Sequence, residues 1–324
     1  MAKILETKSI YYDDVNLIAQ PTALKSRKQI TDIRERIIVS PMASIVGETF
    51  ALEALKNGIQ VPLHRFCDIE TQWKLFVKLI TVYPEYRKRI WGCIGLNDSE
   101  RFSTLYGVGC QNFIVDIANG YLGGLIDFVL QLPSGINLMI GNVHSKDILK
   151  IYDEKLGLER TCKLTVRVGV GQGSPCCTKD MTGYTRGQIT ELLECSEYCR
   201  NTPSRIWLAA DGGIRDSGCA TKAFSAGADY IVLGGYFSHA EEAVSVLTGD
   251  LKYWGGASNY QQELQNGVAK RHSEGKVLEL DKNKIKPLKV LVEDLEGGIQ
   301  SGISYSGFNS LTNFIGNGTF ELKY

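Results

Sequence analysis

The run from Leu164 to Thr178 reads LTVRVGVGQGSPCCT and joins a short apolar segment to a glycine-rich loop that ends in cysteine. The three glycines between Gly169 and Gly173 allow positive φ angles and a close approach of the backbone to a ligand or ion. Cys176 follows this turn, where the predicted strand ends, and strand ends are where barrel enzymes place their chemistry. We therefore interpret the run as a buried strand that presents a candidate nucleophile. A structural cysteine is the alternative interpretation.

Short β-branched and aliphatic runs recur along the 324-residue chain at spacings wide enough for a helix between them. Near-continuous apolar runs without clean alternation are typical of strands buried on both faces, as in a parallel sheet. Eight strands are predicted, at residues 37–39, 59–61, 90–94, 113–115, 138–140, 164–168, 206–209 and 230–233.

Amphipathic stretches lie between these strands, and each predicts a helix. They cover residues 48–56, 69–80, 99–106, 121–131, 146–156, 188–199, 217–226 and 240–247. Strict alternation with eight strands indicates an α/β fold, a closed (β/α)8 TIM barrel, more often than an open sheet. We predict a single-domain barrel over residues 1–324, with an N-terminal arm to about residue 34 and a C-terminal extension from about residue 250. A doubly wound open sheet is the alternative.

The composition restricts the possible partners. The 36 basic and 36 acidic residues balance, so charge gives no reason to expect nucleic acid or an anionic membrane as partner. No apolar signal core or run of about 18 apolar residues predicts a membrane span. The nine cysteines and four histidines lack zinc-site spacing. A reducing, cytoplasmic environment is therefore expected.

Glycines and polar residues follow the predicted strands and would share one rim of the barrel. Gly212-Gly213 and Gly234-Gly235 follow strands seven and eight, where barrels often bind phosphate through bare backbone N–H groups. Ser174 adds a hydroxyl donor for the same anion. Asp211 would repel phosphate, but its carboxylate suits ribose hydroxyls. The predicted ligand is a nucleotide, with Cys176 near its base.

The chain resembles the IMP dehydrogenase/GMP reductase family over nearly its whole length. The pattern Gly171-x-Gly173-Ser174-x-Cys176-x-Thr178 looks like the catalytic loop of that family. Further matching segments are Tyr12–Val15, Leu24–Arg27, Asp116–Gly120, Gly141–Val143, Asp211–Ile214, Leu233–Gly235, Arg271–Lys276, Gly297–Ser301 and Ser304–Gly307.

Within the family the chain is more similar to the reductases. The dehydrogenases usually carry a regulatory domain after the second strand and a long flap with an Arg-Tyr pair that activates water. Here His64-Arg65-Phe66 leads directly into the helix predicted from residue 69, and the segment 255–274 is short and has no Arg-Tyr pair. A reductase has no water to activate and can dispense with the flap.

The resemblance implies a reaction in which GMP and NADPH give IMP, ammonia and NADP. Cys176 would attack the purine C2, ammonia would leave a covalent thioimidate, and hydride would then reach C2. The family assigns to Thr178 and Glu274 the proton relay that the leaving amine needs. It also implies a monovalent cation, K+, on the backbone carbonyls of Gly171, Gly173 and Cys176.

The resemblance also implies binding residues, and it implies a homotetramer. The positions that match the purine nucleotide site are Ser174, Asp211, Gly212, Gly213, Gly234, Gly235, Gly255, Gly256, Ala257, Arg271, Ser273 and Gly275. Those that match the NADPH site are Ser26, Arg27, Arg65, Asp116, Ile117, Ala118, Val170, Gly171, Ser301, Gly302, Ile303 and Ser304. Ser26-Arg27 and Ser301–Ser304 would reach the site from a neighbouring subunit. For Arg271 and Ser273, an exposed polar turn is the alternative.

Four positions depart from the usual family pattern. Pro175 precedes the cysteine, where a small aliphatic residue or lysine is usual, and it stiffens the loop. Cys177 stands where Thr or Ile is usual, which leaves open a vicinal disulfide or a competing thiol. Arg65 replaces a lysine found in many reductases. Gly256-Ala257 replaces a Met-Ser pair that often contacts the base.

Two other functions remain open from the sequence. The first is a dehydrogenase variant without a flap, acting on IMP or a related purine nucleotide, which would need another residue to activate water. The second is a non-catalytic purine-nucleotide-binding barrel. The retention of Cys176, Thr178 and Glu274 together favours an enzyme over that alternative.

Overall fold

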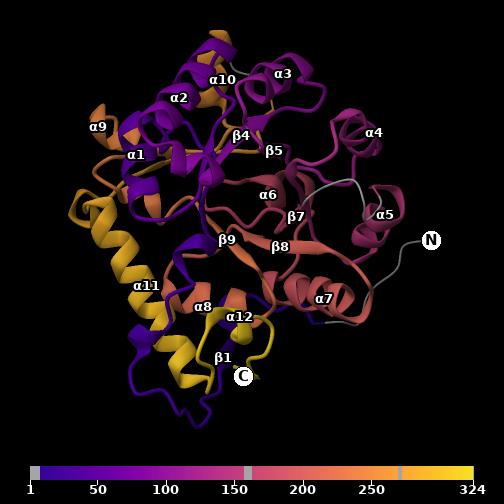
Figure 1. Cartoon of the computed structure of the whole chain (residues 1–324), viewed down its shortest axis with the longest axis vertical. Helices are drawn as coiled ribbons and strands as arrows, with labels where there is room; N and C mark the ends of the chain where they lie inside the picture. The colour runs from indigo at the N-terminus through magenta and orange to yellow at the C-terminus, as the bar shows by residue number, and fades with distance from the viewer. Residues whose placement is uncertain (1–7, 157–162, 269–271, 324) are drawn as a thin grey trace.

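A central sheet of eight parallel strands organises the computed structural model, which describes residues 8–156, 163–268 and 272–323 (Figure 1). The strand order is β2-β9-β8-β7-β6-β5-β4-β3. The strands are β2 (Ile37–Val39), β3 (Val61–Leu63), β4 (Ile90–Ile94), β5 (Asn112–Val115), β6 (Asn137–Val143), β7 (Lys163–Val168), β8 (Ile206–Asp211) and β9 (Tyr230–Leu233).

The two end strands of this order, β2 and β3, meet at Gln60. The Gln60 N–H donates to the Ile37 carbonyl at 2.9 Å, and the Gln60 carbonyl accepts from the Val39 N–H at 3.0 Å. The sheet therefore closes on itself, and the predicted single-domain (β/α)8 barrel is confirmed.

Amphipathic helices cover the outside of the barrel, close to the ranges that the sequence predicts. In α1 the buried residues Phe50, Ala51, Ala54 and Leu55 lie on one stripe. Asp68 caps α2 by accepting the Thr71 N–H at 2.6 Å, which satisfies a free donor of the first turn. Seven of these helices match predicted ranges, namely α1 (Glu48–Lys56), α2 (Ile69–Val82), α3 (Ser99–Gly107), α4 (Gly123–Gln131), α5 (Asp147–Leu156), α7 (Gln188–Asn201) and α8 (Ser217–Ser225).

The eighth outer helix differs from the prediction. The helix expected over 240–247 is reduced to the single turn of α9 (Val244–Leu247), because Ala240 and Ala243 are extended. Instead α11 (Leu288–Tyr305) packs between α8 and α1 (Figure 1). Gly298 and Gly302 allow this, since a Cβ at either position would collide with Ser217 or Thr221 of α8.

Large side chains fill the inside of the barrel. One buried cluster consists of residues that point inward from the strands, namely Ile38, Trp91, Cys93, Ile114, Met139, Ala209, Tyr230 and Val232. Arg167 is also buried, near the carboxyl end of β7. The barrel interior is therefore a packed core with a charged layer close to the rim where the loops lie.

Two small antiparallel ladders attach the terminal segments. β1 (Val15–Leu17) pairs with β12 (Phe320–Leu322), which joins the N-terminal arm to the C-terminal extension. β10 (Lys252–Trp254) pairs with β11 (Val277–Glu279) and brackets α10 (Asn259–Asn266). The second ladder places the chain around Glu274 beside the loop after β7.

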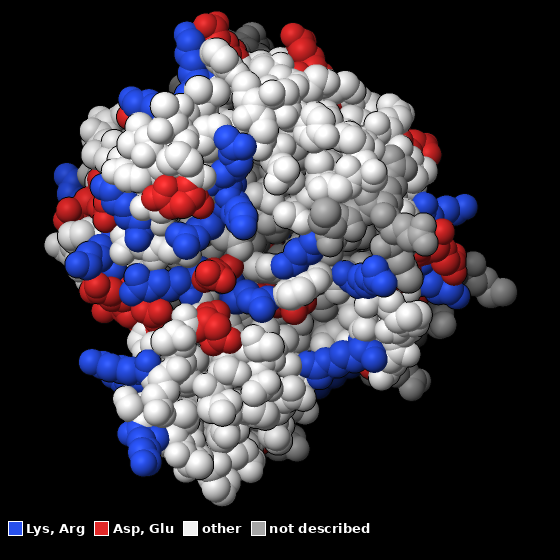
Figure 2. Space-filling model, viewed as in Figure 1, with Lys and Arg blue, Asp and Glu red and all other residues white. Residues whose placement is uncertain are grey.

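The surface carries both signs of charge. Figure 2 shows basic and acidic side chains interleaved in a band across the middle of one face, with mostly uncharged surface above and below it. Among the described residues, no helix is long and apolar enough to span a bilayer.

Candidate active site

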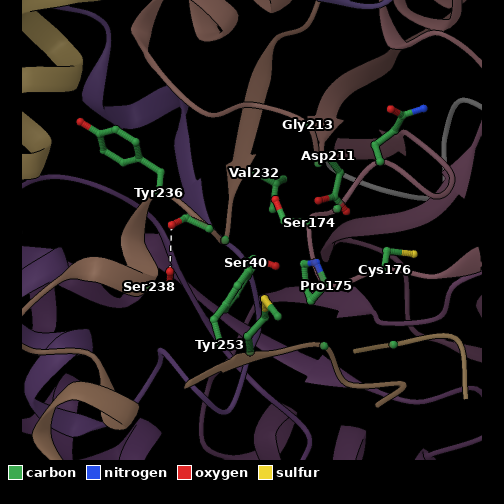
Figure 3. A pocket seen from close by; sticks show the side chains of 18 of the residues that line it. Ser40, Ser174, Pro175, Cys176, Asp211, Gly213, Val232, Tyr236, Ser238 and Tyr253 are labelled. Carbon is green, nitrogen blue, oxygen red and sulfur yellow. Dashed lines mark hydrogen bonds between the residues drawn. The ribbon is translucent and has the colours of Figure 1, made fainter. Parts of the chain in front are cut away.

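A cavity of about 910 Å³ opens at the carboxyl ends of the barrel strands. Its walls come from the loops after β2, β3, β5, β6, β7, β8 and β9 and from the β10–β11 region. In Figure 3, Cys176 lies on one side of Ser174 and Pro175, and Tyr236 lies on the other. The segments after seven of the eight predicted strands therefore share one cavity, and no residue of the segment after β4 is among its lining residues.

The three predicted catalytic residues form a continuous hydrogen-bonded chain. The Cys176 thiol donates to Thr178 Oγ1 at 3.2 Å, and the Thr178 hydroxyl donates to Glu274 Oε2 at 2.7 Å. Each residue lines the cavity and is partly buried. A proton can thus pass from the sulfur to the carboxylate through one hydroxyl, without a mobile water.

Backbone hydrogen bonds join the loop that carries Cys176 and Thr178 to the segment that carries Glu274. The Cys177 N–H donates to the Glu274 carbonyl at 2.6 Å, and the Lys276 N–H donates to the Pro175 carbonyl at 2.8 Å. Gly275 also forms a bridge with Ser258. The loop after β7 and the segment before β11 thus form one unit, which fixes the relative positions of thiol and carboxylate.

Hydroxyl groups and glycine amides gather at the end of β8 and β9. Gly212 and Gly213 have φ angles of 92° and 73°, a region that favours glycine. Ser174 Oγ lies 3.8 Å from the Cβ position of Gly235, and the Tyr253 ring lies 3.6 Å from it. This cluster of N–H and O–H donors can surround a phosphate group.

A buried charge triad lies beneath the cavity. Arg167 Nη2 is 3.2 Å from Asp116 Oδ1, and Arg167 Nη1 is 3.5 Å from Asp211 Oδ2. Asn142 Nδ2 donates to Asp211 Oδ2 at 2.9 Å. Burial raises the pKa of Asp211, and the opposing effects of Arg167 and Asn142 are smaller. Burial would lower the pKa of Arg167, but the two aspartates outweigh it and raise that pKa.

The loops after β3 and β5 form the opposite wall. Arg65 Nε donates to the Asp116 carbonyl at 3.1 Å, and its guanidinium lies 5.0 Å from the centre of the Phe66 ring. Ile117 and Ala118 line the same wall. Burial lowers the pKa of neighbouring His64 to about 4, so this imidazole is neutral at physiological pH.

The loop after β7 presents backbone oxygens that suit a monovalent cation. The Gly171 and Cys176 carbonyls accept no hydrogen bond from any residue that the structure describes, whereas the Gly173 carbonyl accepts from the Cys176 N–H at 2.9 Å. Carbonyl oxygens of this kind can replace the hydration shell of K+. The three residues therefore fit the predicted ion.

Most predicted binding residues line the cavity, but several do not. Ser273 is half-buried, and its hydroxyl bonds to the Ala257 carbonyl at 2.7 Å, which holds a turn at the cavity's edge. Arg271 lies outside the described residues. Arg27 Nη1 donates to Ser301 Oγ at 2.5 Å, so the arm and α11 meet, but on the outside of the barrel. The predicted residues away from the cavity are Ser26, Arg27, Ser273, Ser301, Gly302, Ile303 and Ser304.

The structure adds residues that sequence reasoning did not assign to the site. Ser40 and Met42 line the cavity after β2, and both lie against Gly234. Tyr253 lines it from β10, and nothing in the sequence distinguishes this residue from a core aromatic. Arg167 could have been recognised from the sequence, because a charged residue within a strand predicted to be buried needs buried partners of opposite charge.

Comparisons with known proteins agree with this geometry. The model of the IMP dehydrogenase / GMP reductase domain matches residues 9–323. The "GMP reductase" of Shewanella halifaxensis is 28% identical, and the alignment covers 98% of this chain and 96% of that protein. "GMP reductase 1" of Mus musculus and of Homo sapiens are each 30% identical over 99% of this chain and 96% of theirs. The chain therefore belongs to the IMP dehydrogenase / GMP reductase family.

Proposed function

We propose that this protein catalyses the NADPH-dependent reductive deamination of GMP to IMP and ammonia. The observation that carries the proposal is the hydrogen-bonded chain from Cys176 through Thr178 to Glu274 at the wall of the nucleotide-sized cavity. A thiol that is connected to a carboxylate through one hydroxyl suits attack by sulfur together with protonation of the amine that it displaces.

The cavity can orient GMP by its two ends. The 5′ phosphate would lie against Gly213, Gly235, Ser174 and Tyr253, where N–H and O–H donors gather. The Asp211 carboxylate, at the end of β8, would accept hydrogen bonds from the ribose hydroxyls. The base would then extend along Gly255–Ala257 towards Cys176, which lines the same cavity.

The first half of the reaction exchanges the amine for sulfur. The Cys176 sulfur forms a bond to C2 of the purine, and the C2–N bond breaks. The thiol proton passes through Thr178 to Glu274 and then to the departing nitrogen, so that ammonia leaves and a thioimidate remains on Cys176. Protonation is needed because an unprotonated amine is a poor leaving group.

The second half returns the free enzyme. NADPH, when bound, supplies the hydride that replaces sulfur at C2. Arg65, Asp116, Ile117, Ala118, Val170 and Gly171 would hold the cofactor, since they line the cavity beside the catalytic loop. Glu274 then takes up a proton from solvent and passes it through Thr178 to the Cys176 sulfur as IMP forms, so that the thiol is restored.

A bound K+ would order the catalytic loop. The Gly171, Gly173 and Cys176 carbonyls are its ligands in this proposal, and two of them accept no other hydrogen bond among the described residues. The role of the ion is to fix the backbone around Cys176, because carbonyl oxygens can replace its hydration shell.

The same proposal includes a homotetramer in the cytoplasm that serves purine nucleotide salvage. Ser26, Arg27 and Ser301–Ser304 lie outside the cavity of their own chain, as expected if they complete a neighbour's cofactor site. The eight cysteines that the structure describes are all free thiols, which suits a reducing compartment.

Two incubations test the proposed function. With GMP and NADPH, we expect loss of NADPH absorbance and stoichiometric formation of IMP and ammonia. With IMP and NAD, we expect no formation of reduced cofactor. If NAD is reduced in the incubation with IMP, and NADPH is not consumed in the incubation with GMP, the protein is instead a dehydrogenase. Nucleotide binding without turnover in either incubation would indicate a non-catalytic barrel.

A further inference from the structure

An aromatic ring occupies the space that a side chain at position 256 would need. A Cβ on Gly256 would overlap Cζ of Phe66, and it would lie 2.7 Å and 2.8 Å from Cε2 and Cε1. The tip of the Phe66 ring therefore points at the bare Gly256 backbone. Both residues line the cavity, although 190 positions separate them in the sequence. Glycine at 256 is thus a steric requirement of this ring position.

Pro175 extends the same surface towards the nucleophile. Its Cγ lies 3.8 Å from the Cβ position of Gly255, and the next residue is Cys176. Pro175, Gly255, Gly256 and Phe66 together form a continuous apolar wall, which we call the base wall. Two unusual features of the sequence, the proline before the cysteine and the glycine at 256, meet in this one wall.

Local contacts hold the Phe66 ring in place. The Phe66 N–H donates to His64 Nδ1 at 3.2 Å, and the two rings stack with centroids 6.2 Å apart. Burial keeps the His64 side chain neutral, with a pKa of about 4. The Arg65 guanidinium lies over the Phe66 ring and bonds to Asp116. The ring is therefore preorganised before any ligand enters.

We propose that Phe66 is the residue that contacts and positions the purine base, in place of a side chain at position 256. The base wall gives the planar purine a flat apolar surface beside Cys176, which favours stacking and keeps C2 near the sulfur. This inference rests on the proposed function for the identity of the base. Its test uses binding, which does not require turnover.

Calorimetry with two ligands separates a base contact from a general structural role. IMP carries the base, whereas ribose 5-phosphate has the same phosphate and sugar and lacks it. For Phe66→Ala we expect IMP to bind about tenfold more weakly (~1.4 kcal/mol), because the base loses its stacking contact with the aromatic ring. We expect ribose 5-phosphate affinity to change less than about twofold. Phe308→Ala, a half-buried phenylalanine outside the cavity, should affect neither ligand.

A reciprocal exchange tests the steric argument. Gly256→Met alone should weaken IMP binding more than about tenfold, because the new side chain collides with the Phe66 ring. Phe66→Ala combined with Gly256→Met should restore IMP affinity to within about threefold of the natural protein, since methionine then fills the vacated space.

Three results would overturn the inference. They are an unchanged IMP affinity in Phe66→Ala, an equal loss for both ligands, or a double variant that binds IMP no better than Gly256→Met alone. If these variants behave as expected but GMP is not reduced, the proposed function fails and the base wall stands. If GMP is reduced but Phe66→Ala leaves IMP affinity unchanged, the base wall fails and the proposed function stands.

Discussion

The Thr178 hydroxyl donates a hydrogen bond to Glu274 Oε2 at 2.7 Å, although the two residues are 96 positions apart. Thr178 begins the short helix α6 (Thr178–Thr182), and Glu274 precedes β11. Two segments that are far apart in the sequence therefore share one proton path. Its other end is the Cys176 sulfur, so removing the hydroxyl should disconnect thiol and carboxylate.

Thr178→Val tests this path with a side chain of nearly the same shape. We expect kcat for GMP reduction to fall about 10²-fold or more, because general acid–base catalysis typically contributes 10² to 10⁴. The KM for GMP should change much less. Thr178→Ser keeps the hydroxyl and should retain most of the rate. A valine variant as fast as the natural protein would show that the hydroxyl carries no proton.

Tyr253→Phe tests the phosphate end of the cavity. Loss of a hydrogen bond to a charged group costs about 1.5 to 3 kcal/mol, so IMP should bind roughly tenfold or more weakly. Affinity for inosine, which has no phosphate, should not change. Tyr236→Phe is the matched control, because the Tyr236 hydroxyl donates to the Leu291 carbonyl at 3.0 Å. Equal losses for IMP and inosine in Tyr253→Phe would argue against phosphate contact.

Arg167→Met tests the buried charge triad. The side chain is 5% exposed, and its loss leaves Asp116 and Asp211 without their shared cation. We expect the free energy of unfolding in urea to fall by about 3 to 5 kcal/mol. The control is Arg215→Met, which removes an exposed pair with Asp13 and should cost less than ~1 kcal/mol. Similar losses in both variants would contradict the assigned role of the triad.

Glu191 predicts a pH dependence of stability. The side chain is fully buried in α7, neither carboxyl oxygen has a partner among the described residues, and burial raises its pKa well above 4.5. The folded state then holds a proton that the unfolded state releases. The contribution of Glu191 is therefore fully favourable below pH 4.5 and is lost as the pH rises through the raised pKa.

Glu191→Gln should remove the decrease in stability that Glu191 causes as the pH rises. We expect a higher free energy of unfolding at neutral pH, by about 1 to 3 kcal/mol, and a flatter dependence on pH. The comparison is Glu194→Gln, which breaks the ion pair with Arg186 and should lower stability. A glutamine variant whose stability falls with pH as steeply as that of the natural protein would exclude Glu191 as the source.

The sequence predicts the barrel because its strands are continuous apolar runs, and the closed eight-strand sheet confirms it. The bounds of the second strand show a limit of prediction from the local sequence pattern. It was expected over residues 59–61 but runs Val61–Leu63, because Pro62 occupies a position that strand predictions avoid. The helix α11 was not predicted, although its six buried residues have helical spacing, and two poor helix formers, Gly297 and Gly298, lie within it.

The candidate site, like the fold, could be predicted only in part from the sequence. Ser174 and Cys176 could be named from the residue types in the glycine loop, whereas Glu274 was named only because the chain resembles the family. The contact between Phe66 and Gly256 could not, because it depends on how two distant loops pack. Tyr253 is similar, since only the β10–β11 ladder brings its ring beside Gly235.

The most direct test of the central claim compares two adjacent cysteines by GMP-dependent oxidation of NADPH. Cys176 and Cys177 are both half-buried free thiols, but only the Cys176 sulfur bonds to Thr178 among the described contacts. We predict that Cys176→Ala lowers kcat by about 10³-fold or more while IMP still binds, and that Cys177→Ala retains the rate within a few-fold. Turnover by Cys176→Ala at the rate of the natural protein, or loss of turnover in Cys177→Ala alone, would contradict the account.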